Sequence, residues 1–387
     1  MHDIKAFVVF LIIVLTIYIL TNLYIYSRGY LALSPAGWVF WAYTAIFILL
    51  GCLFPLGFLL RNTPYCTVCE VVTWAGSFWL GAMLYFFLFA IAFDLLFLAN
   101  NYLHFVAFDI REQAVNFGKI VFLSAVALVS IVMVFGYCNS RNIKPKEVEM
   151  FLPRLPAEHD ALSIALVSDI HLGIIIHEER LEEVVDGVNT LEPDIILIGG
   201  DVFDESERIV DNMVGTLSRL RSRYGVFAVL GNHDFYAGHK ALVGIMERAN
   251  ITVLRNRLVT VPGVINIVGL DDPEGARFGE PWGGSIEDLV SEKDDALPTL
   301  LVYHPPIRMD EFAAAGIDVM VSGHSHNGQI FPFCYITNLV YAIGYGYGRV
   351  GSMQVYVSSG VGTWGPPMRV GTHSEIVKIT LHSGLPQ

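Results

Sequence analysis

Four long apolar runs occupy the first part of the chain and constrain its fold more than any other feature. They cover residues 7–26, 38–60, 72–98 and 120–137. Each run is close to the ~20 residues that an α-helix needs to cross the ~30 Å hydrocarbon core of a bilayer. One such run could be a buried core helix, but four in succession with few charges predict transmembrane helices.

The overall composition supports a chain that lies partly in lipid. Of its 387 residues, 54% are hydrophobic and 16% are charged, whereas soluble domains carry about 25% charged residues. The first run could be a signal peptide, but it is long, lacks a small-residue cleavage site and precedes further spans. We therefore expect a retained first helix and an integral, multi-pass membrane protein.

Lysine and arginine residues near the span ends predict the orientation. Six lie on one side of the predicted membrane and three on the other. Because positive charge favours the cytoplasmic side, we expect both termini, and the whole chain after the fourth span, in the cytoplasm. The six are Lys5, Arg61, Arg141, Lys144, Lys146 and Arg154, and the three are Arg28, Arg111 and Lys119.

Two features of the membrane region have more than one interpretation. Asp94 lies within the third run, where a carboxylate is either a functional group or a residue near the interface; the nearby Asn100 favours the interface. Cys66 and Cys69 form a lone C-x-x-C. Without a second pair, ordinary thiols are favoured over a zinc or redox site.

After residue 160 the sequence alternates short apolar runs with charged stretches. Apolar runs of about 4–8 residues are typical of buried strands, and the charged stretches Glu178–Thr190 and Glu207–Arg223 suit surface helices. This alternation predicts an α/β domain over residues 161–387, joined to a membrane domain (1–140) by a linker (141–160). The predicted strands cover residues 164–167, 194–198, 226–230, 299–303 and 318–321.

Each predicted strand ends in a polar cluster. Ligands in open α/β sheets bind at the carboxyl ends of strands, so we expect the clusters to converge. A lone His is usually structural, but five such clusters predict a metal site that suits Mn, Fe or Zn. Two ions about 3.5–4 Å apart can clamp the oxygens of a phosphoryl transfer. The clusters are Asp169-Ile170-His171, Gly199-Gly200-Asp201, Gly231-Asn232-His233-Asp234, His304 and Gly323-His324-Ser325-His326.

The five clusters, in this order, resemble the calcineurin-like metallophosphoesterase superfamily. Its pattern is D-x-H, G-D-x-x-D, G-N-H-[DE], a lone H and G-H-x-H, and every position is occupied here by the expected type. The resemblance implies two packed β-sheets flanked by helices, and two divalent metal ions (Mn, Fe or Zn). It further implies these ligands: Asp169, His171 and His326 for the first ion, Asp201 as the bridge, and Asn232, His304 and His324 for the second.

The resemblance also implies a catalytic pair that does not bind metal. His233 would protonate the leaving oxygen or stabilise the charged transition state. Asp204 would orient His233 through a hydrogen bond. The presence of both residues favours a catalytic member of the family.

Nearly the whole chain is similar to the membrane-bound branch of this superfamily, the transmembrane metallophosphoesterases. The similarity lies in the multi-span region and in the segments 323–333 and 363–369; that branch often has Gly where this chain has Asn327. We expect Asn327, Trp364 and Arg369 to contact substrate, Arg369 through a bidentate contact with a phosphate. A rigid surface turn with a solvated Arg369 is equally compatible with the sequence.

A glycine- and tyrosine-rich segment, residues 344–348 (GYGYG), matches no phosphate-binding motif by its spacing. No helix is predicted to start after it. We expect a mobile aromatic loop that contacts the substrate or the bilayer.

Three functions are compatible with the sequence. The first is a membrane phosphoesterase that cleaves a lipid-linked phosphodiester or pyrophosphate by metal-activated hydroxide. The second is an anchored phosphatase or nucleotide phosphodiesterase for soluble substrates, and the third is a non-catalytic membrane sensor or scaffold. The net charge of −13 argues against a nucleic-acid partner, since nucleic-acid binders usually have a basic face.

Overall fold

The structure, a computed structural model, describes residues 2–60, 67–104, 110–156, 161–282 and 284–384. The chain divides into two compact units. The first comprises Met1–Gly136 with Gly365–Pro367, and the second comprises Tyr137–Trp364 with Met368–Gln387.

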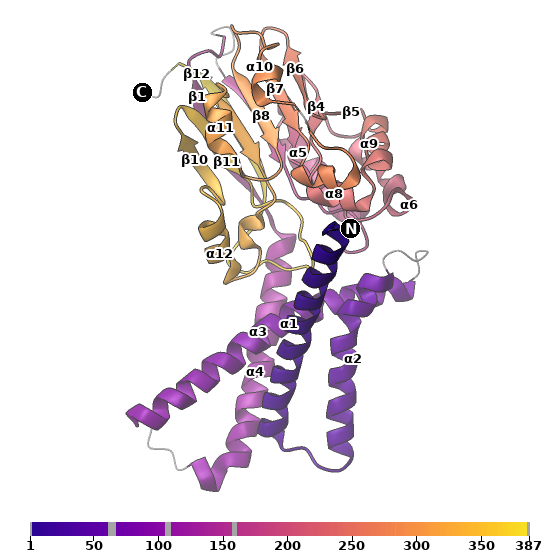
Figure 1. The fold of residues 1–387 in the computed structure, drawn as a ribbon, viewed down its shortest axis with the longest axis vertical. Coiled ribbons are helices and arrows are strands. Elements are labelled where there is room, and N and C mark those ends of the chain that lie inside the picture. The colour runs from indigo at the N-terminus through magenta and orange to yellow at the C-terminus, as the bar shows by residue number, and fades with distance from the viewer. Residues whose placement is uncertain (1, 61–66, 105–109, 157–160, 283, 385–387) are drawn as a thin grey trace. The chain divides into compact units, whose positions relative to one another are not determined.

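The first unit contains the helices predicted from the apolar runs (Figure 1). Within the described residues, four helices are long and apolar enough to cross a membrane, as the apolar runs predict. Large apolar side chains such as Ile12, Leu59, Leu95 and Ile131 are exposed on them, as lipid-facing helices require. The helices are α1 (His2–Leu33), α2 (Trp38–Leu60), α3 (Thr67–Leu103) and α4 (Ile110–Arg141).

Asp94 has close partners within this unit. Its carboxylate accepts a hydrogen bond from Tyr24 Oη at 2.5 Å and pairs with Arg28 at 2.6 Å. Such pairing lowers the cost of a charge within a membrane span. Cys69 is disulfide-bonded, so the expectation of an ordinary thiol is wrong at this position. Cys66 and Arg61 lie outside the described residues.

The second unit has two mixed β-sheets, which confirms the α/β class. In the part of the chain that the structure describes, each sheet has six strands, in the orders β1-β12-β2-β3-β4-β5 and β10-β11-β9-β8-β7-β6. The first sheet contains β1 (Ile143–Leu152), β2 (Ala161–Val167), β3 (Ile195–Ile198), β4 (Val226–Ala228), β5 (Ile251–Val253) and β12 (Ser374–Ser383). The second contains β6 (Arg257–Val261), β7 (Ile265–Leu270), β8 (Thr299–Tyr303), β9 (Val319–Ser322), β10 (Gly346–Val350) and β11 (Met353–Val357).

Helices flank both sheets. An apolar core between the sheets includes Leu166, Val302 and Tyr356, while Leu181 of α5 belongs to the core on one outer side and Phe312 of α11 to the core on the other. Because both faces of each sheet are covered, the central strands are apolar throughout. The helical segments are α5 (Glu178–Thr190), α6 (Glu207–Val210), η1 (Asp211–Met213), α7 (Val214–Leu217), α8 (Asn232–Ala237), α9 (His239–Arg248), η2 (Pro273–Phe278), α10 (Ile286–Val290), α11 (Met309–Ala314), η3 (His326–Gly328) and α12 (Phe333–Val340).

Three segments differ from the sequence-based expectation. The stretch 207–223 is not one helix but α6, η1 and α7, which end at Leu217, because its Asn, Asp, Gly and β-branched residues are weak helix formers. The segment 344–348 is not a mobile loop throughout, since β10 starts at Gly346 and pairs antiparallel with β11. Strand β1 lies within the predicted linker and pairs parallel with β12.

Candidate metal centre

Polar loops that follow five strands bring the predicted ligands together. The donor atoms of Asp169, His171 and His326 lie within 4.8 Å of one another, and so do those of one further group, Asp201, His304 and His324. The first group follows β2 and β9, and the second follows β3, β8 and β9. Residues separated by more than 150 positions in the sequence thus meet at one place, as the carboxyl ends of the strands predict.

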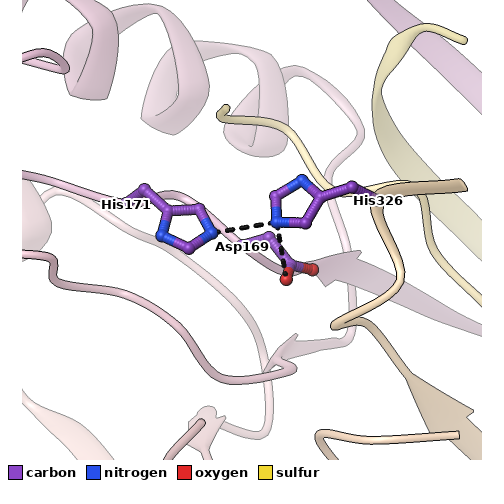
Figure 2. A group of neighbouring side chains, drawn as sticks. All are labelled: Asp169, His171 and His326. Carbon is purple, nitrogen blue, oxygen red and sulfur yellow. Dashed lines mark hydrogen bonds and ion pairs between the residues drawn. The ribbon is translucent and has the colours of Figure 1, made fainter. Parts of the chain in front are cut away.

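The first group places two ring nitrogens and a carboxylate around a small space (Figure 2). His171 Nε2 lies 3.0 Å from His326 Nε2, and His326 Nε2 lies 3.4 Å from Asp169 Oδ1. All three side chains are buried. Three ligand atoms at such distances fit a divalent cation that contacts all of them.

Asp201 lies between the two groups. Its Oδ2 is 3.1 Å from His304 Nε2 and 3.9 Å from His171 Nε2. On the other side of the second group, His324 Nδ1 lies 3.0 Å from Asn232 Oδ1. A single carboxylate thus lies near imidazoles of both groups.

The second group contains a buried nitrogen that fits a cation. His304 Nδ1 lies 2.8 Å from Gly199 O and donates to it. Its Nε2 is buried and makes no well-aligned hydrogen bond among the described residues, although the Asp201 carboxylate lies 3.1 Å away. Buried polar atoms normally have a partner, and metal-binding histidines commonly donate their other ring N–H to a carbonyl in this way. A cation at Nε2 would satisfy both observations.

The backbone at the ligands is unusual. Left-handed φ values are uncommon outside glycine and concentrate at functional sites. Here they occur at Asp169, His171, Asp201, His324 and His326, with φ between 48° and 69°. Gly231 fits against the same cluster, because an added Cβ would overlap Asp201 Oδ1. The loops therefore hold these side chains through main-chain conformations that few residue types adopt.

The carboxylates and imidazoles perturb one another's acidity. Burial alone would lower the pKa of His304. The carboxylates of Asp201, Asp169 and Asp272 outweigh burial and raise this pKa to about 10. Burial also lowers the pKa of His171, and Asp204 and nearby carboxylates raise it to about 9. Burial and the nearby His304 lower the pKa of His324 to about 4. Nearby carboxylates thus raise the pKa of two of these imidazoles, whereas burial and a neighbouring imidazole lower the pKa of the third.

His233 lies beside the ligands and has the predicted partner. Its Nδ1 is 2.8 Å from Asp204 Oδ1, and its side chain is 16% exposed. The same Asp204 oxygen lies 2.7 Å from His171 Nδ1, a contact that the sequence did not predict. The donor atoms of His171, Asp201 and His233 also lie within 4.8 Å of one another, so distance alone does not separate His233 from the ligands.

The three predicted substrate contacts have different surroundings. Trp364 is 55% exposed, and its ring centre lies 5.7 Å from that of His233. Asn327 is half-buried in η3. Arg369 is fully buried and donates to Ser359 O at 2.6 Å and to Gly362 O at 2.7 Å. The predicted phosphate contact of Arg369 is therefore wrong, because backbone carbonyls surround its guanidinium.

The sequence motif includes Asp234 but does not predict the role that this buried carboxylate has near the site. Asp234 accepts hydrogen bonds from the N–H groups of Val202 and Phe203, each at 3.0 Å, and of Gly231 at 2.9 Å, so it ties the Asp201 loop to the Asn232 loop. Burial and the nearby Asp201 raise the pKa of Asp234 to about 7. Asp234 is the last residue of the G-N-H-[DE] motif, so the motif marks this position.

Glu375 organises the turn that follows β11. It accepts hydrogen bonds from Ser359 N at 2.9 Å, Ser358 Oγ at 3.1 Å and Tyr356 Oη at 3.2 Å. The carbonyls that Arg369 contacts belong to the same turn. No sequence motif includes Glu375, so only the fold identifies its role.

Comparison with known proteins identifies relatives of the whole chain and of its second unit. Residues 162–328 match the family profile described as "Calcineurin-like phosphoesterase". An "Uncharacterized metallophosphoesterase" of Helicobacter pylori is 34% identical over 70% of this chain and 72% of the relative. A "Transmembrane protein with metallophosphoesterase domain" of Bos taurus is 32% identical over 67% of this chain and 62% of the relative.

Two further matches differ in how much of the chain they cover. An uncharacterized metallophosphoesterase of Campylobacter jejuni is 29% identical over 97% of this chain and 98% of its own length. Among solved structures, a 5'-nucleotidase precursor from Thermus thermophilus matches with 17% identity and a TM-score of 0.36. The match covers 58% of this chain and 54% of the nucleotidase chain. A structural similarity this low carries no conclusion about activity.

Proposed function

Because the chain belongs to the calcineurin-like metallophosphoesterase family, and so to the phosphoesterase hydrolases, we propose that it cleaves phosphodiester or pyrophosphate bonds of a lipid-linked substrate at a dinuclear metal centre. The observation that carries the proposal is the position of Asp201 between two groups of ligand atoms. A bridging carboxylate is the feature that distinguishes a two-ion centre from two separate sites.

The distances support one set of ligands for each ion. Asp169, His171 and His326 would hold the first ion, Asn232, His304 and His324 would hold the second, and Asp201 would contact both. Imidazole with oxygen ligands suits Mn, Fe or Zn. When bound, the two ions would supply positive charge to the phosphoryl oxygens and lower the pKa of the attacking water.

His233 and Asp204 perform the proton chemistry in this proposal. Asp204 accepts a hydrogen bond from His233 Nδ1, which fixes the ring and leaves Nε2 to face the substrate. A protonated His233 can then donate from Nε2 to the leaving oxygen as its bond to phosphorus breaks. Its partial exposure allows this contact, whereas the ligands of the first ion are buried.

A lipid-linked substrate is supported by two independent features. The four membrane-length helices keep the hydrolase unit tethered to a bilayer. Around His233, exposed aromatic side chains form a rim: Tyr236 is 52% exposed, Phe278 42% and Trp364 55%. Such a rim suits a substrate with an apolar part. The distribution of Lys and Arg favours a cytoplasmic location for this unit.

The test is an activity screen of the purified full-length protein in nanodiscs with Mn. The substrates are lipid phosphodiesters, lipid pyrophosphates, soluble phosphomonoesters and nucleotide diesters, and Asp201→Asn is the control for contaminating activity. We expect release of a phosphorylated headgroup that the control abolishes. Efficient turnover of soluble esters with no lipid cleavage would instead support an anchored enzyme for soluble substrates.

A further inference from the structure

Helix α12 carries a surface that is unusual for a folded hydrolase unit. Its large hydrophobic side chains are exposed at 86% for Leu339, 66% for Val340, 63% for Tyr335 and 52% for Ile336. Side chains with this spacing lie on one face of a helix. Residues 331–348 contain no Asp, Glu, Lys or Arg. The exposed face of α12 is therefore apolar, and the segment around it carries no charged side chain.

The exposed side chains form a patch and are not scattered. Phe331 and Phe333, at the start of α12, are also exposed, at 44% and 42%. Contiguous apolar patches on a soluble surface mark an interaction site, because water does not favour them. The patch therefore needs an apolar partner.

We propose that α12 lies in the membrane interface, with Tyr335, Ile336, Leu339 and Val340 at the boundary between lipid headgroups and acyl chains. The membrane-length helices of the chain would anchor it in a bilayer. The last of them, α4, ends at Arg141, and the second unit begins at Tyr137. Tyrosine and phenylalanine mixed with aliphatic residues are typical of segments at this depth. A lipid surface is thus the apolar partner that the chain's own membrane helices favour.

Short contacts fix α12 to the metal centre. Phe333 N donates to Ile330 O at 2.9 Å, and an added Cβ at Gly328 would overlap the backbone of Cys334. Just after α12, the ring centre of Tyr341 lies 6.2 Å from that of His324. The loop that carries His324 and the segment of α12 therefore pack against each other.

This connection determines what membrane contact would do. With α12 in the interface, the loop that carries His324 would lie near the headgroups, because Tyr341, directly after α12, contacts His324. A phosphate in the headgroup layer could then reach the ligands without leaving the bilayer. The membrane contact itself does not depend on the substrate proposed above, and its test measures no catalysis.

The test is lipid quenching of a probe on α12 in the full-length protein. Leu339→Cys is introduced into a chain in which the free cysteines Cys52, Cys138 and Cys334 are Ser, and is labelled with an environment-sensitive fluorophore. The protein is placed in phosphatidylcholine nanodiscs that contain a nitroxide lipid quencher. The matched control is Asp295→Cys, whose side chain is 87% exposed in the same unit. Labelling of the parent chain is subtracted.

We expect at least about twofold stronger quenching at position 339 than at position 295. A second variant, which adds Ile336→Glu and Val340→Glu to the labelled chain, should lose most of this quenching, because carboxylates are costly to place among acyl chains. Equal quenching at 339 and 295 would overturn the proposal. So would a probe that is protected from aqueous iodide but not quenched by lipid, since a protein or a second copy would then cover α12.

Discussion

Replacement of Arg369 by Met should destabilise the second unit. The guanidinium is fully buried and donates to Ser359 O at 2.6 Å and to Gly362 O at 2.7 Å, with a longer bond to Gly360 O at 3.2 Å. Met has a similar length and no donors. The substitution therefore removes the hydrogen bonds and leaves most of the volume filled.

The expected decrease in the free energy of unfolding is the balance of two opposing effects. A buried carbonyl without a partner costs about 1–3 kcal/mol, so the two short bonds alone account for about 2–6 kcal/mol. Burial of the cation itself is unfavourable, as the lowering of the Arg369 pKa to about 10 by burial indicates, and the variant regains that cost. Loss of one member of a buried charged network typically costs about 3–5 kcal/mol, and we expect a value in this range.

Thermal unfolding of the full-length protein in detergent measures this loss. For a unit of this size, about 1 kcal/mol shifts Tm by about 2–4 °C, so the variant should unfold about 6–20 °C lower. The matched control is Arg277→Met, because Arg277 is 75% exposed and pairs only at the surface with Glu274. Unfolding of both variants within about 2 °C of the wild type would refute a structural role for Arg369.

Further predictions concern the metal centre. Asp201→Asn should lower activity at least about 100-fold and reduce bound metal, measured by turnover and by elemental analysis, because it removes the bridging charge. His233→Gln should lower kcat about 10²–10⁴-fold with metal content unchanged, whereas Asp204→Asn should also lower metal content, since Asp204 contacts His171 as well. Mn affinity of metal-free protein should rise with pH between 6 and 8, by up to about 100-fold per pH unit, because His171 and His304, with pKa values of about 9 and about 10, must each release a proton. By the same shifts, these two groups stabilise the metal-free fold below pH ~6.5, and their contribution is lost as pH rises through the raised pKa values.

Each of these predictions has a result that contradicts it. Full metal content in Asp201→Asn argues against a bridge, and loss of metal in His233→Gln would make His233 a ligand. Titration calorimetry at several pH values gives the affinities. A His304→Gln variant whose affinity keeps the wild-type pH dependence would show that His304 does not exchange its proton for the ion.

The metal centre was predictable from sequence because its chemistry restricts residue types. A divalent ion needs carboxylate, amide or imidazole donors, and the ends of strands are where a sheet can gather them. The membrane helices were predictable for a similar reason, since the thickness of a bilayer sets the length of an apolar run. In both cases a physical requirement that does not depend on the fold restricts the residue types in the sequence.

Other features depend on neighbours that only the fold supplies. The Pro-rich segment 363–369 indicates a turn, but the direction of Arg369 depends on the carbonyls of residues 359–362. The second contact of Asp204 depends on the distance to His171 across two loops. Strand β10 forms because β11 pairs with it, so its five residues alone do not predict it.

The left-handed backbone at Asp169, His171, Asp201, His324 and His326 limits how this centre can be re-engineered. Apart from glycine, Asp, Asn and His are the residues that most readily adopt such conformations. Exchange of a histidine for cysteine to favour a softer metal would therefore change the donor atom and strain the main chain at once. Metal preference in this scaffold is better altered at His304, which is not among these left-handed positions and is oriented by a hydrogen bond to Gly199 O.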